Sequence, residues 1–263
     1  MCGIAGYSLS SASRFDRTLA AQALLAGIAE RGADAAGYAY RDDAGAVTIV
    51  KRRAGASALL EDLAIPDGAT QALVHVRDYT KGHPSIEANN HPIRHGAVVG
   101  IHNGRIVNDE EIFAGHGFIR AEPEMTVDSE AIFALVELGD ARPKVLEELH
   151  GTMATAWVDE RRPDVLFVAR AVGRPLWLGR GKHETFFAST RDALEVVESS
   201  LRTSLRKSEV EEGTLVALRG GKPAWSERFT PDRSHREEPL PAVRAAEEGV
   251  FCLSRLAAIV AAA

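Results

Sequence analysis

A cysteine stands directly behind Met1 in a chain that contains only one other, Cys252. Cys2 is small, so we expect Met1 to be trimmed, which leaves a thiol and a free α-amine on one residue. A terminal amine has a pKa of about 8, well below that of lysine, and can accept the thiol proton near neutral pH. This is the N-terminal form of nucleophilic catalysis. Taken alone, however, a cysteine at this position is more often an ordinary residue.

Arg77 follows the apolar run ALVHV and precedes a loop that contains Gly82. A guanidinium at the end of a strand can bind a carboxylate through two parallel hydrogen bonds. Taken by itself, this arginine is equally well interpreted as part of a structural ion pair.

Asn103 and Gly104 follow a second apolar run, AVVGIH. On its own, an Asn-Gly pair favours a hairpin turn between two strands. The functional alternative is an oxyanion hole, in which the asparagine side-chain amide and the glycine backbone N–H point at one oxygen atom.

Asp128 lies in the stretch TVDSE, which opens an apolar helical pattern. An aspartate at a helix start is individually best interpreted as an N-cap, but it can also receive an ammonium group. Together the four stretches offer a thiol with its own base, a carboxylate clamp, an oxyanion hole and an ammonium acceptor. A small amino acid with a carbonyl group in its side chain requires this set.

The elements that must position these groups are mostly strands. Helical patterns cover 15–32, 128–139 and 191–201, with Gly32 at the C′ position of the first, and a docked helix is expected at the C-terminus. Apolar runs predict consecutive strands, and a hairpin loop is expected at 42–45. Segregated helices and consecutive strands indicate an α+β fold rather than alternating βαβ units.

The composition excludes several classes of function. The chain has 263 residues and a formal net charge of -6, which gives no sign of a nucleic-acid surface. Its two distant cysteines fit a reducing cytoplasm, and neither a signal peptide nor a membrane span is expected from the sequence pattern. We therefore expect a cytoplasmic protein with no nucleic-acid or membrane partner. The sequence shows no phosphate-binding loop, so no cofactor and no metal are expected.

Several motifs occur in the order and spacing of a known family. They are Cys2-Gly3-Ile4, Arg31-Gly32-Ala33-Asp34-Ala35-Ala36-Gly37, His75-Val76-Arg77-Asp78-Tyr79-Thr80-Lys81-Gly82, Asn89-Asn90-His91-Pro92, His102-Asn103-Gly104 and Asp128-Ser129-Glu130. Over residues 2 to 220 the chain resembles the glutaminase domain of class II glutamine amidotransferases, members of the N-terminal nucleophile hydrolase superfamily. Within that family it is similar to the glutaminase half of glucosamine-6-phosphate synthase.

The resemblance implies a four-layer αββα sandwich and a specific chemistry. By that resemblance Cys2 attacks the side-chain amide of glutamine, giving a γ-glutamyl thioester and ammonia. Asn103 and Gly104 hold the oxyanion, while Arg77 binds the α-carboxylate of glutamine and Asp128 its α-ammonium. Two further residues match substrate-loop positions of the family, Thr80 and His91.

The chain departs from the family at two positions of the loop after Arg77. Asp78 replaces an aromatic residue that is frequent there, and Lys81 replaces a histidine. We expect Asp78 to pair with Arg77 or Lys81, which affects closure of the loop. Further along, the family's Arg-Asp pair is Arg170-Ala171 here.

The resemblance leaves three functions open. Residues 2–220 are expected to form the glutaminase domain, and residues 221–263 a C-terminal extension with a docked helix. The first hypothesis is a glutaminase that delivers ammonia to a separate synthase chain. The second is a self-sufficient hydrolase of another γ-glutamyl amide, and the third is a catalytically silent regulatory subunit. The sequence does not decide between a monomer and a homo-oligomer.

Overall fold

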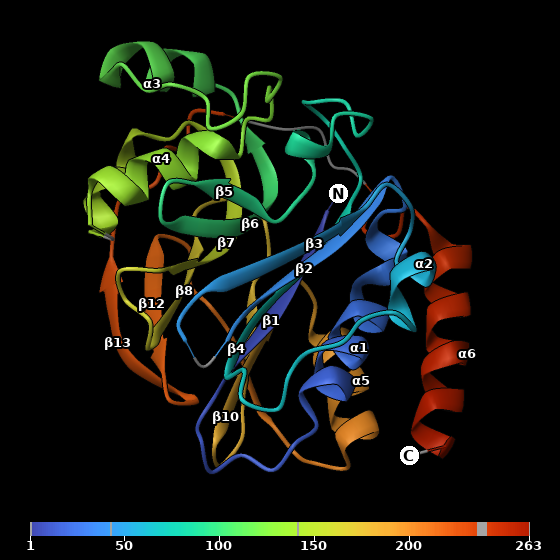
Figure 1. Ribbon diagram of the computed structural model, residues 1–263. Helices are drawn as coiled ribbons and strands as arrows, with labels where there is room; N and C mark the ends of the chain where they lie inside the picture. The colour runs from blue at the N-terminus through green and yellow to red at the C-terminus, as the bar shows by residue number, and fades with distance from the viewer. Residues whose placement is uncertain (1, 43, 141, 236–240, 263) are drawn as a thin grey trace.

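Two antiparallel sheets lie face to face in the computed structural model, which describes residues 2–42, 44–140, 142–235 and 241–262. The described residues of the first sheet form strands in the order β11-β9-β10-β1-β4-β2-β3, and those of the second in the order β13-β12-β8-β7-β6-β5 (Figure 1). The strands are β1 Gly3–Leu9, β2 Ala35–Arg41, β3 Val47–Arg52, β4 Gln71–Arg77, β5 Ile93–His95, β6 Val98–Ile106, β7 Gly151–Asp159, β8 Val165–Arg170, β9 Trp177–Arg180, β10 Glu184–Ala188, β11 Arg206–Glu209, β12 Thr214–Arg219 and β13 Lys222–Arg228.

Helices cover the outer face of each sheet (Figure 1). Helices α1 and α5 pack together over the first sheet with α6 outside them, and α3 and α4 lie on the second. The helices are α1 Arg17–Ile28, α2 Ser57–Leu60, α3 Asp109–His116, α4 Glu130–Leu138, α5 Arg191–Leu201 and α6 Ala246–Ala262, with short 3₁₀ helices η1 Ala29–Arg31, η2 Glu87–Asn89 and η3 Pro143–Glu148. This arrangement confirms the predicted α+β fold with αββα layers.

Side-chain alternation along the strands determines which residues face the space between the sheets. Successive residues of a strand point to opposite faces. Ile4 in β1, Leu73 in β4 and Ile101 in β6 share one apolar cluster in that space. Residues an even number of positions away along the same strands continue on the same face. Three predicted site residues fall on it: Cys2, Arg77 and Asn103.

The expected helices and the first hairpin are present. The patterns at 128–139 and 191–201 correspond to α4 and α5, and β2 pairs with β3 across the loop at 42–45, of which Asp43 lies outside the described residues. Gly32 was predicted at the C′ position of the first helix, and this prediction was wrong. Gly32 ends η1 with a φ of 179°, which is extended rather than left-handed backbone.

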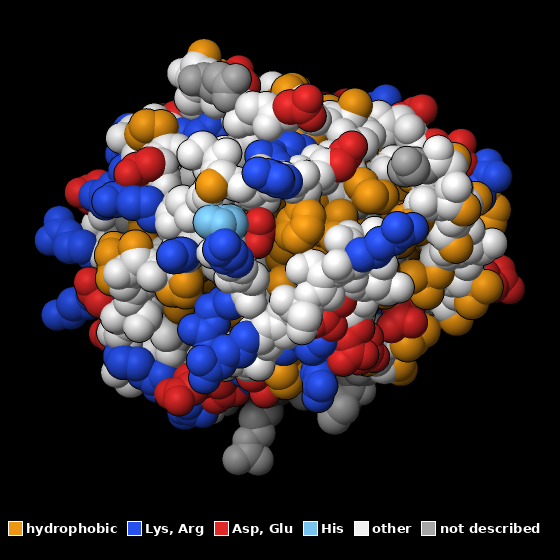
Figure 2. All heavy atoms as spheres, turned by 90° about the horizontal axis from the view of Figure 1, so that it is seen from below, with side chains coloured by type: hydrophobic (Ala, Val, Ile, Leu, Met, Phe, Trp, Pro, Cys, Tyr) orange, Lys and Arg blue, Asp and Glu red, His pale blue; other side chains and the backbone are white. Residues whose placement is uncertain are grey.

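The C-terminal helix α6 is amphipathic and packs against α1 and η1. Cys252 and Leu256 of α6 are buried in the apolar cluster that includes α1. Val250 and Phe251 lie on the exposed side of α6. Seen from below, apolar side chains are frequent toward the side of the molecule where α6 lies (Figure 2). Among the described residues, no helix is both long and apolar enough to cross a membrane.

Candidate active site

Six of the seven predicted site residues line one cavity. Its wall contains Cys2, Arg77, Gly104 and Asp128 together with Thr80 and His91. Asn103, the seventh, is fully buried in β6 next to Gly104. The cavity lies where β1, β4 and β6 bring their ends together, because β1 pairs with β4 and the two sheets face each other across β1 and β6.

Cys2 lies just before the first residue of β1, and Gly3 pairs with Val76 of β4. This register sets Cys2 opposite Arg77, the last residue of β4. The thiol donates to the backbone carbonyl of Asp78, with 3.5 Å between sulfur and oxygen. Burial raises the pKa of the Cys2 thiol, while the Arg77 guanidinium acts in the opposite direction. A thiol with a raised pKa is mostly protonated at neutral pH, so it needs a base before it can attack.

Arg77 is buried and its guanidinium bonds to polar groups of two loops. Nη1 donates to Asn90 Oδ1 at 2.6 Å, and Nη2 donates to the carbonyls of Lys81, at 2.9 Å, and Gly82. Asn90 belongs to the Asn89-Asn90-His91-Pro92 motif, and nothing in the sequence pattern indicated that it orients the arginine.

Asn103 lies within β6, paired with Ala154 of β7, so the hairpin-turn interpretation was wrong. Among the described residues neither Nδ2 nor Oδ1 of Asn103 has a hydrogen-bond partner, although the residue is fully buried. A buried amide without partners destabilises a fold by about 1–3 kcal/mol and calls for a functional reason. The buried amide of Asn103 therefore has hydrogen-bonding capacity that no described group of the protein uses.

Gly104 must be glycine for two reasons. Its φ is +147°, a conformation that residues with a side chain rarely adopt. In addition, an added Cβ would overlap with the carbonyl oxygen of Thr152 on β7. This backbone places the residue after Asn103 at the cavity wall.

Asp128 is buried directly before α4 and does not act as the N-cap, so that interpretation was also wrong. Ser129 occupies the N-cap position, and Asp128 Oδ2 accepts the backbone N–H of Ile106 in β6 at 2.6 Å. Burial raises the pKa of Asp128 to about 6, and the nearby Asp109 carboxylate acts in the same direction. A buried, poorly solvated carboxylate is suited to receive an ammonium group.

Three buried histidines lie around the cavity, and two of them, His91 and His102, line it. His75 and His91 stack with ring centroids 4.2 Å apart, and His75 Nε2 lies 3.1 Å from the carbonyl of His102. Burial lowers the pKa of His75 and of His102 to about 3 and that of His91 well below its ordinary value. These rings are therefore neutral at physiological pH and do not compete with Arg77 or with a substrate ammonium for charge partners.

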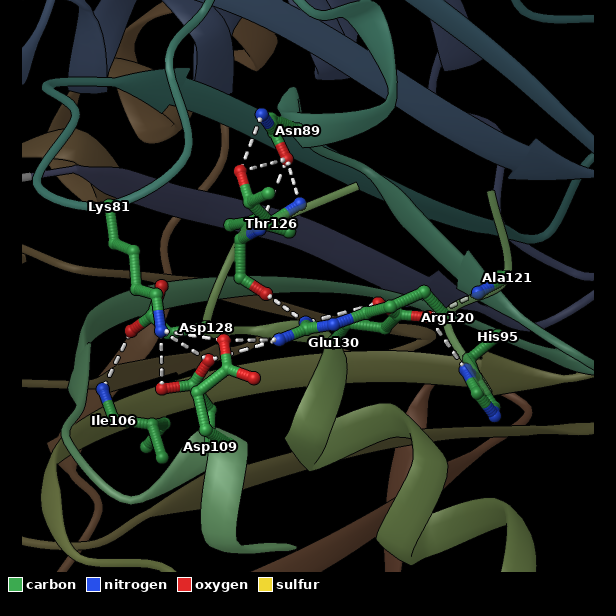
Figure 3. A network of polar contacts seen from close by, with 12 residues as sticks. Lys81, Asn89, His95, Ile106, Asp109, Arg120, Ala121, Thr126, Asp128 and Glu130 are labelled. Atoms are coloured by element: carbon green, nitrogen blue, oxygen red, sulfur yellow. Dashed lines mark hydrogen bonds and ion pairs between the residues drawn. The ribbon is translucent and has the colours of Figure 1, made fainter. Parts of the chain in front are cut away.

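The sequence motifs contain positioning residues that pattern analysis left without a role. Ser129 pairs with His102 Nδ1 at 2.8 Å and so joins α4 to the strand that carries Asn103. Asn89 Oδ1 accepts the backbone N–H groups of Thr126 and Val127 at 2.7 and 3.0 Å (Figure 3). These contacts fix the approach to Asp128.

The Arg31–Gly37 motif contacts both Cys2 and the loop that follows Arg77. Arg31 Nε donates to the carbonyl of Cys2 at 3.0 Å, and Asp34 Oδ2 accepts the N–H of Tyr79 at 2.9 Å. An added Cβ at Gly32 would overlap with the backbone of Arg77, which is the reason that glycine is needed there. The fixed spacing of this motif was the only sequence signal for these roles.

Asp78 and Lys81, the two loop residues that depart from the family, both form ion pairs. Lys81 Nζ lies 2.6 Å from Asp109 Oδ2 on α3, and Arg120 reaches the same carboxylate at 3.2 Å (Figure 3). Asp78 Oδ2 pairs with Arg244 Nε at 3.0 Å. The pairing of Asp78 with Arg244 was not foreseen, because we expected its partner within the loop itself.

Comparison with known proteins gives one consistent result. Residues 75–196 match the family model described as "Glutamine amidotransferase domain". The chain is 32% identical over 234 residues to glutamine–fructose-6-phosphate aminotransferase (isomerizing) of Vibrio vulnificus strain YJ016, and 35% identical to that of Salmonella typhi. Each alignment covers 83% of this chain and 35% of the relative. The chain thus spans about a third of the length of the curated relatives it matches.

Solved structures share the fold. The glutamine phosphoribosylpyrophosphate amidotransferase of B. subtilis superposes with a TM-score of 0.69 at 22% identity, over 88% of this chain and 50% of that one. A structure described as the allosteric regulatory enzyme of purine biosynthesis gives a TM-score of 0.68 at 23% identity. The sequence motifs, the layered sheets and these relatives together identify a class II glutamine amidotransferase domain in this chain, with the fold of the N-terminal nucleophile hydrolases.

Proposed function

We propose that this protein hydrolyses the side-chain amide of glutamine through a Cys2 thioester and supplies the ammonia to a separate synthase chain. The observation that carries the proposal is the buried, unpartnered amide of Asn103 beside the cavity that Cys2, Arg77 and Asp128 line. No other described arrangement of the chain combines a nucleophile, an oxyanion donor and charge partners for both ends of an amino acid.

The first step requires removal of Met1, since its peptide bond occupies the Cys2 nitrogen in the printed chain. The freed amine takes the thiol proton, and the thiolate attacks the Cδ carbon of glutamine. Asn103 Nδ2 and the Gly104 N–H donate to the resulting oxyanion, and each such donor lowers the barrier by about 3–4 kcal/mol in well-studied hydrolases.

Collapse of the tetrahedral intermediate breaks the C–N bond. The Cys2 ammonium returns its proton to the leaving nitrogen, which departs as ammonia and leaves the γ-glutamyl thioester. Water, deprotonated by the same amine, then attacks the thioester and releases glutamate and the free thiol. Throughout these steps the α-carboxylate of glutamine is held by Arg77 and its α-ammonium by Asp128, and Thr80 and His91 line the space around the substrate.

Residues 2–220 contain every group in this mechanism, and we propose that they form the glutaminase domain with 221–263 as its extension. The extension begins with β13, which pairs with β12 and continues the second sheet. The acceptor of the ammonia is proposed to be a separate chain. Co-purification with an ammonia-using enzyme that stimulates the glutaminase tests this part.

The experiment for the hydrolysis itself combines mass and activity. Intact mass of the purified protein should show loss of Met1, and the mature protein should release ammonia and glutamate in equal amounts from glutamine. A thiol-directed glutamine analogue should label Cys2 and not Cys252. A mature protein that binds glutamine, fails to turn it over and is not labelled would support the silent regulatory subunit instead. Turnover of another γ-glutamyl amide in preference to glutamine would support the self-sufficient hydrolase.

A further inference from the structure

The loop after Arg77 closes the candidate site in this structure. Tyr79, Thr80 and Lys81 form part of the cavity wall, and the cavity that remains has a volume of about 10 Å³. A space of this size holds about one water molecule. This space is too small for glutamine while the loop, residues 78–82, keeps its present position.

The hydrogen bonds of Arg77 to the loop are a second sign that the loop is closed. A guanidinium can hold a carboxylate by its Nε–Nη2 edge or by its Nη1–Nη2 edge, and both edges include Nη2. Here Nη2 donates to the carbonyls of Lys81 and Gly82. The loop's own backbone therefore takes the place of the substrate α-carboxylate.

Asp78 links this closed loop to the C-terminal segment. Its backbone carbonyl accepts the Cys2 thiol, and its side chain pairs with Arg244, 166 positions further along the chain. One residue thus contacts both the nucleophile and a segment outside the region that carries the sequence motifs.

Arg244 is itself held firmly. The N–H groups of Arg244 and Ala245 both donate to the carbonyl of Glu30 at 2.8 Å. Four residues further on, Glu248 Oε1 accepts the N–H of Ser57 at 2.6 Å at the start of α2. Cys252 of α6 is buried in the apolar cluster that includes α1. These contacts hold the start of α6 in place, and Arg244, just before it, reaches Asp78.

We propose that Arg244 is a positioning residue that holds loop 78–82 in its closed form, so that displacement of the C-terminal segment opens the glutamine site. We call the Arg244–Asp78 pair the latch. Its effect on the rate of glutamine hydrolysis rests on the proposed function. A second fastening, Lys81 to Asp109, holds the other side of the loop and limits the effect of losing the first. The side chains of Arg244 and Asp78 are 39% and 21% exposed, and pairs of this kind shift equilibria by a few-fold, roughly 2- to 5-fold.

The test uses the mature full-length protein and its Arg244→Ala variant. The rate at which iodoacetamide alkylates Cys2 without substrate, followed by peptide mass, should rise ~2- to 5-fold as the open fraction increases. The kcat/KM for glutamine should rise by the same factor through a lower KM, because apparent affinity scales with the open fraction. Arg244→Lys keeps the charge and should stay near the parent in both measurements.

Arg255→Ala is the matched control. Arg255 lies on α6, the helix that follows Arg244, and pairs with Glu61 at 2.7 Å; neither Arg255 nor Glu61 lines the cavity. This variant should change neither rate. Asp78→Asn should repeat the effect of Arg244→Ala, and the double variant should add nothing further, as expected for two residues that act through one contact.

The outcomes separate the latch from the proposed function. An unchanged alkylation rate in Arg244→Ala, or an equal rise in Arg255→Ala, overturns the latch even if glutamine is hydrolysed. A fall in kcat/KM also overturns it, since Arg244 would then support productive closure over the substrate. Faster alkylation in a protein that never hydrolyses glutamine supports the latch and refutes the proposed function.

Discussion

Replacement of Asp128 by asparagine should weaken glutamine binding and stabilise the free protein at the same time. The new side chain would keep an oxygen that can accept the Ile106 N–H and lose only the negative charge. In the folded protein burial raises the pKa of Asp128 from 3.8 to about 6. A shift of about 2 units means that the ionised side chain costs about 3 kcal/mol of folding free energy at pH 7.

The sign of this cost follows from proton binding. Between the unfolded pKa of 3.8 and the folded pKa of about 6, the folded state binds more protons than the unfolded state. The stability contributed by Asp128 is therefore greatest at low pH, declines as the pH rises through this window and is constant above it. The Asp128→Asn variant should have a free energy of unfolding higher by up to about 3 kcal/mol at pH 7, and by little near pH 4.

Glutamine binding should respond in the opposite direction. Removing one partner of a buried charge pair costs about 2–5 kcal/mol, which corresponds to a rise in KM of ~30-fold to several thousand-fold. In the parent protein, KM should also rise ~10-fold per pH unit below about pH 6, as protonation of Asp128 removes the partner of the ammonium. The Asp128→Asn variant should lack this dependence.

The assay pairs glutaminase kinetics with urea denaturation of parent and variant at about pH 4.5 and about pH 7.5. Equal stability of the two proteins at the higher pH would show that Asp128 is not a strained buried carboxylate. An unchanged KM would show that it does not receive the substrate ammonium. Either result refutes the reasoning given for this residue.

Three further predictions concern the proposed nucleophile Cys2, the proposed oxyanion donor Asn103, and Gly32, which packs against the backbone of Arg77. Cys2→Ala should abolish hydrolysis with the fold retained in circular dichroism, whereas Cys252→Ala should leave kcat and KM unchanged, because Cys252 is fully buried and burial raises its pKa to about 12. Asn103→Ala should lower kcat ~100- to 1,000-fold. It should change the free energy of unfolding by no more than about 1 kcal/mol, because removal of an unpartnered buried amide offsets the cavity that it leaves. A large loss of stability would indicate that the amide contacts a partner. Gly32→Ala should destabilise the protein by about 1–3 kcal/mol in urea denaturation and raise KM, because its Cβ overlaps with the Arg77 backbone; a neutral result would contradict the close approach.

Local pattern was sufficient to predict several of the strands and helices. The apolar runs of β4 and β6 and the helical spacing of α4 and α5 are properties of neighbouring residues, and the structure has these elements where they were expected. Two local rules failed at functional positions. Asn103-Gly104 did not form a turn, because pairing of β6 with β7 continues through it, and Asp128 did not cap α4, because its carboxylate bonds to β6 instead.

The order of the residues was enough to show which chemical groups are available and where along the chain they occur. Cys2 next to the chain start, Arg77 at a strand end and Asp128 before a helix could be read from spacing, because spacing fixes local geometry. What surrounds these groups became known from the folded chain alone: the unpartnered amide of Asn103 and the Arg244–Asp78 pair. These features depend on contacts between segments far apart in the chain, which packing of the two sheets and of α6 brings together and which no local pattern encodes.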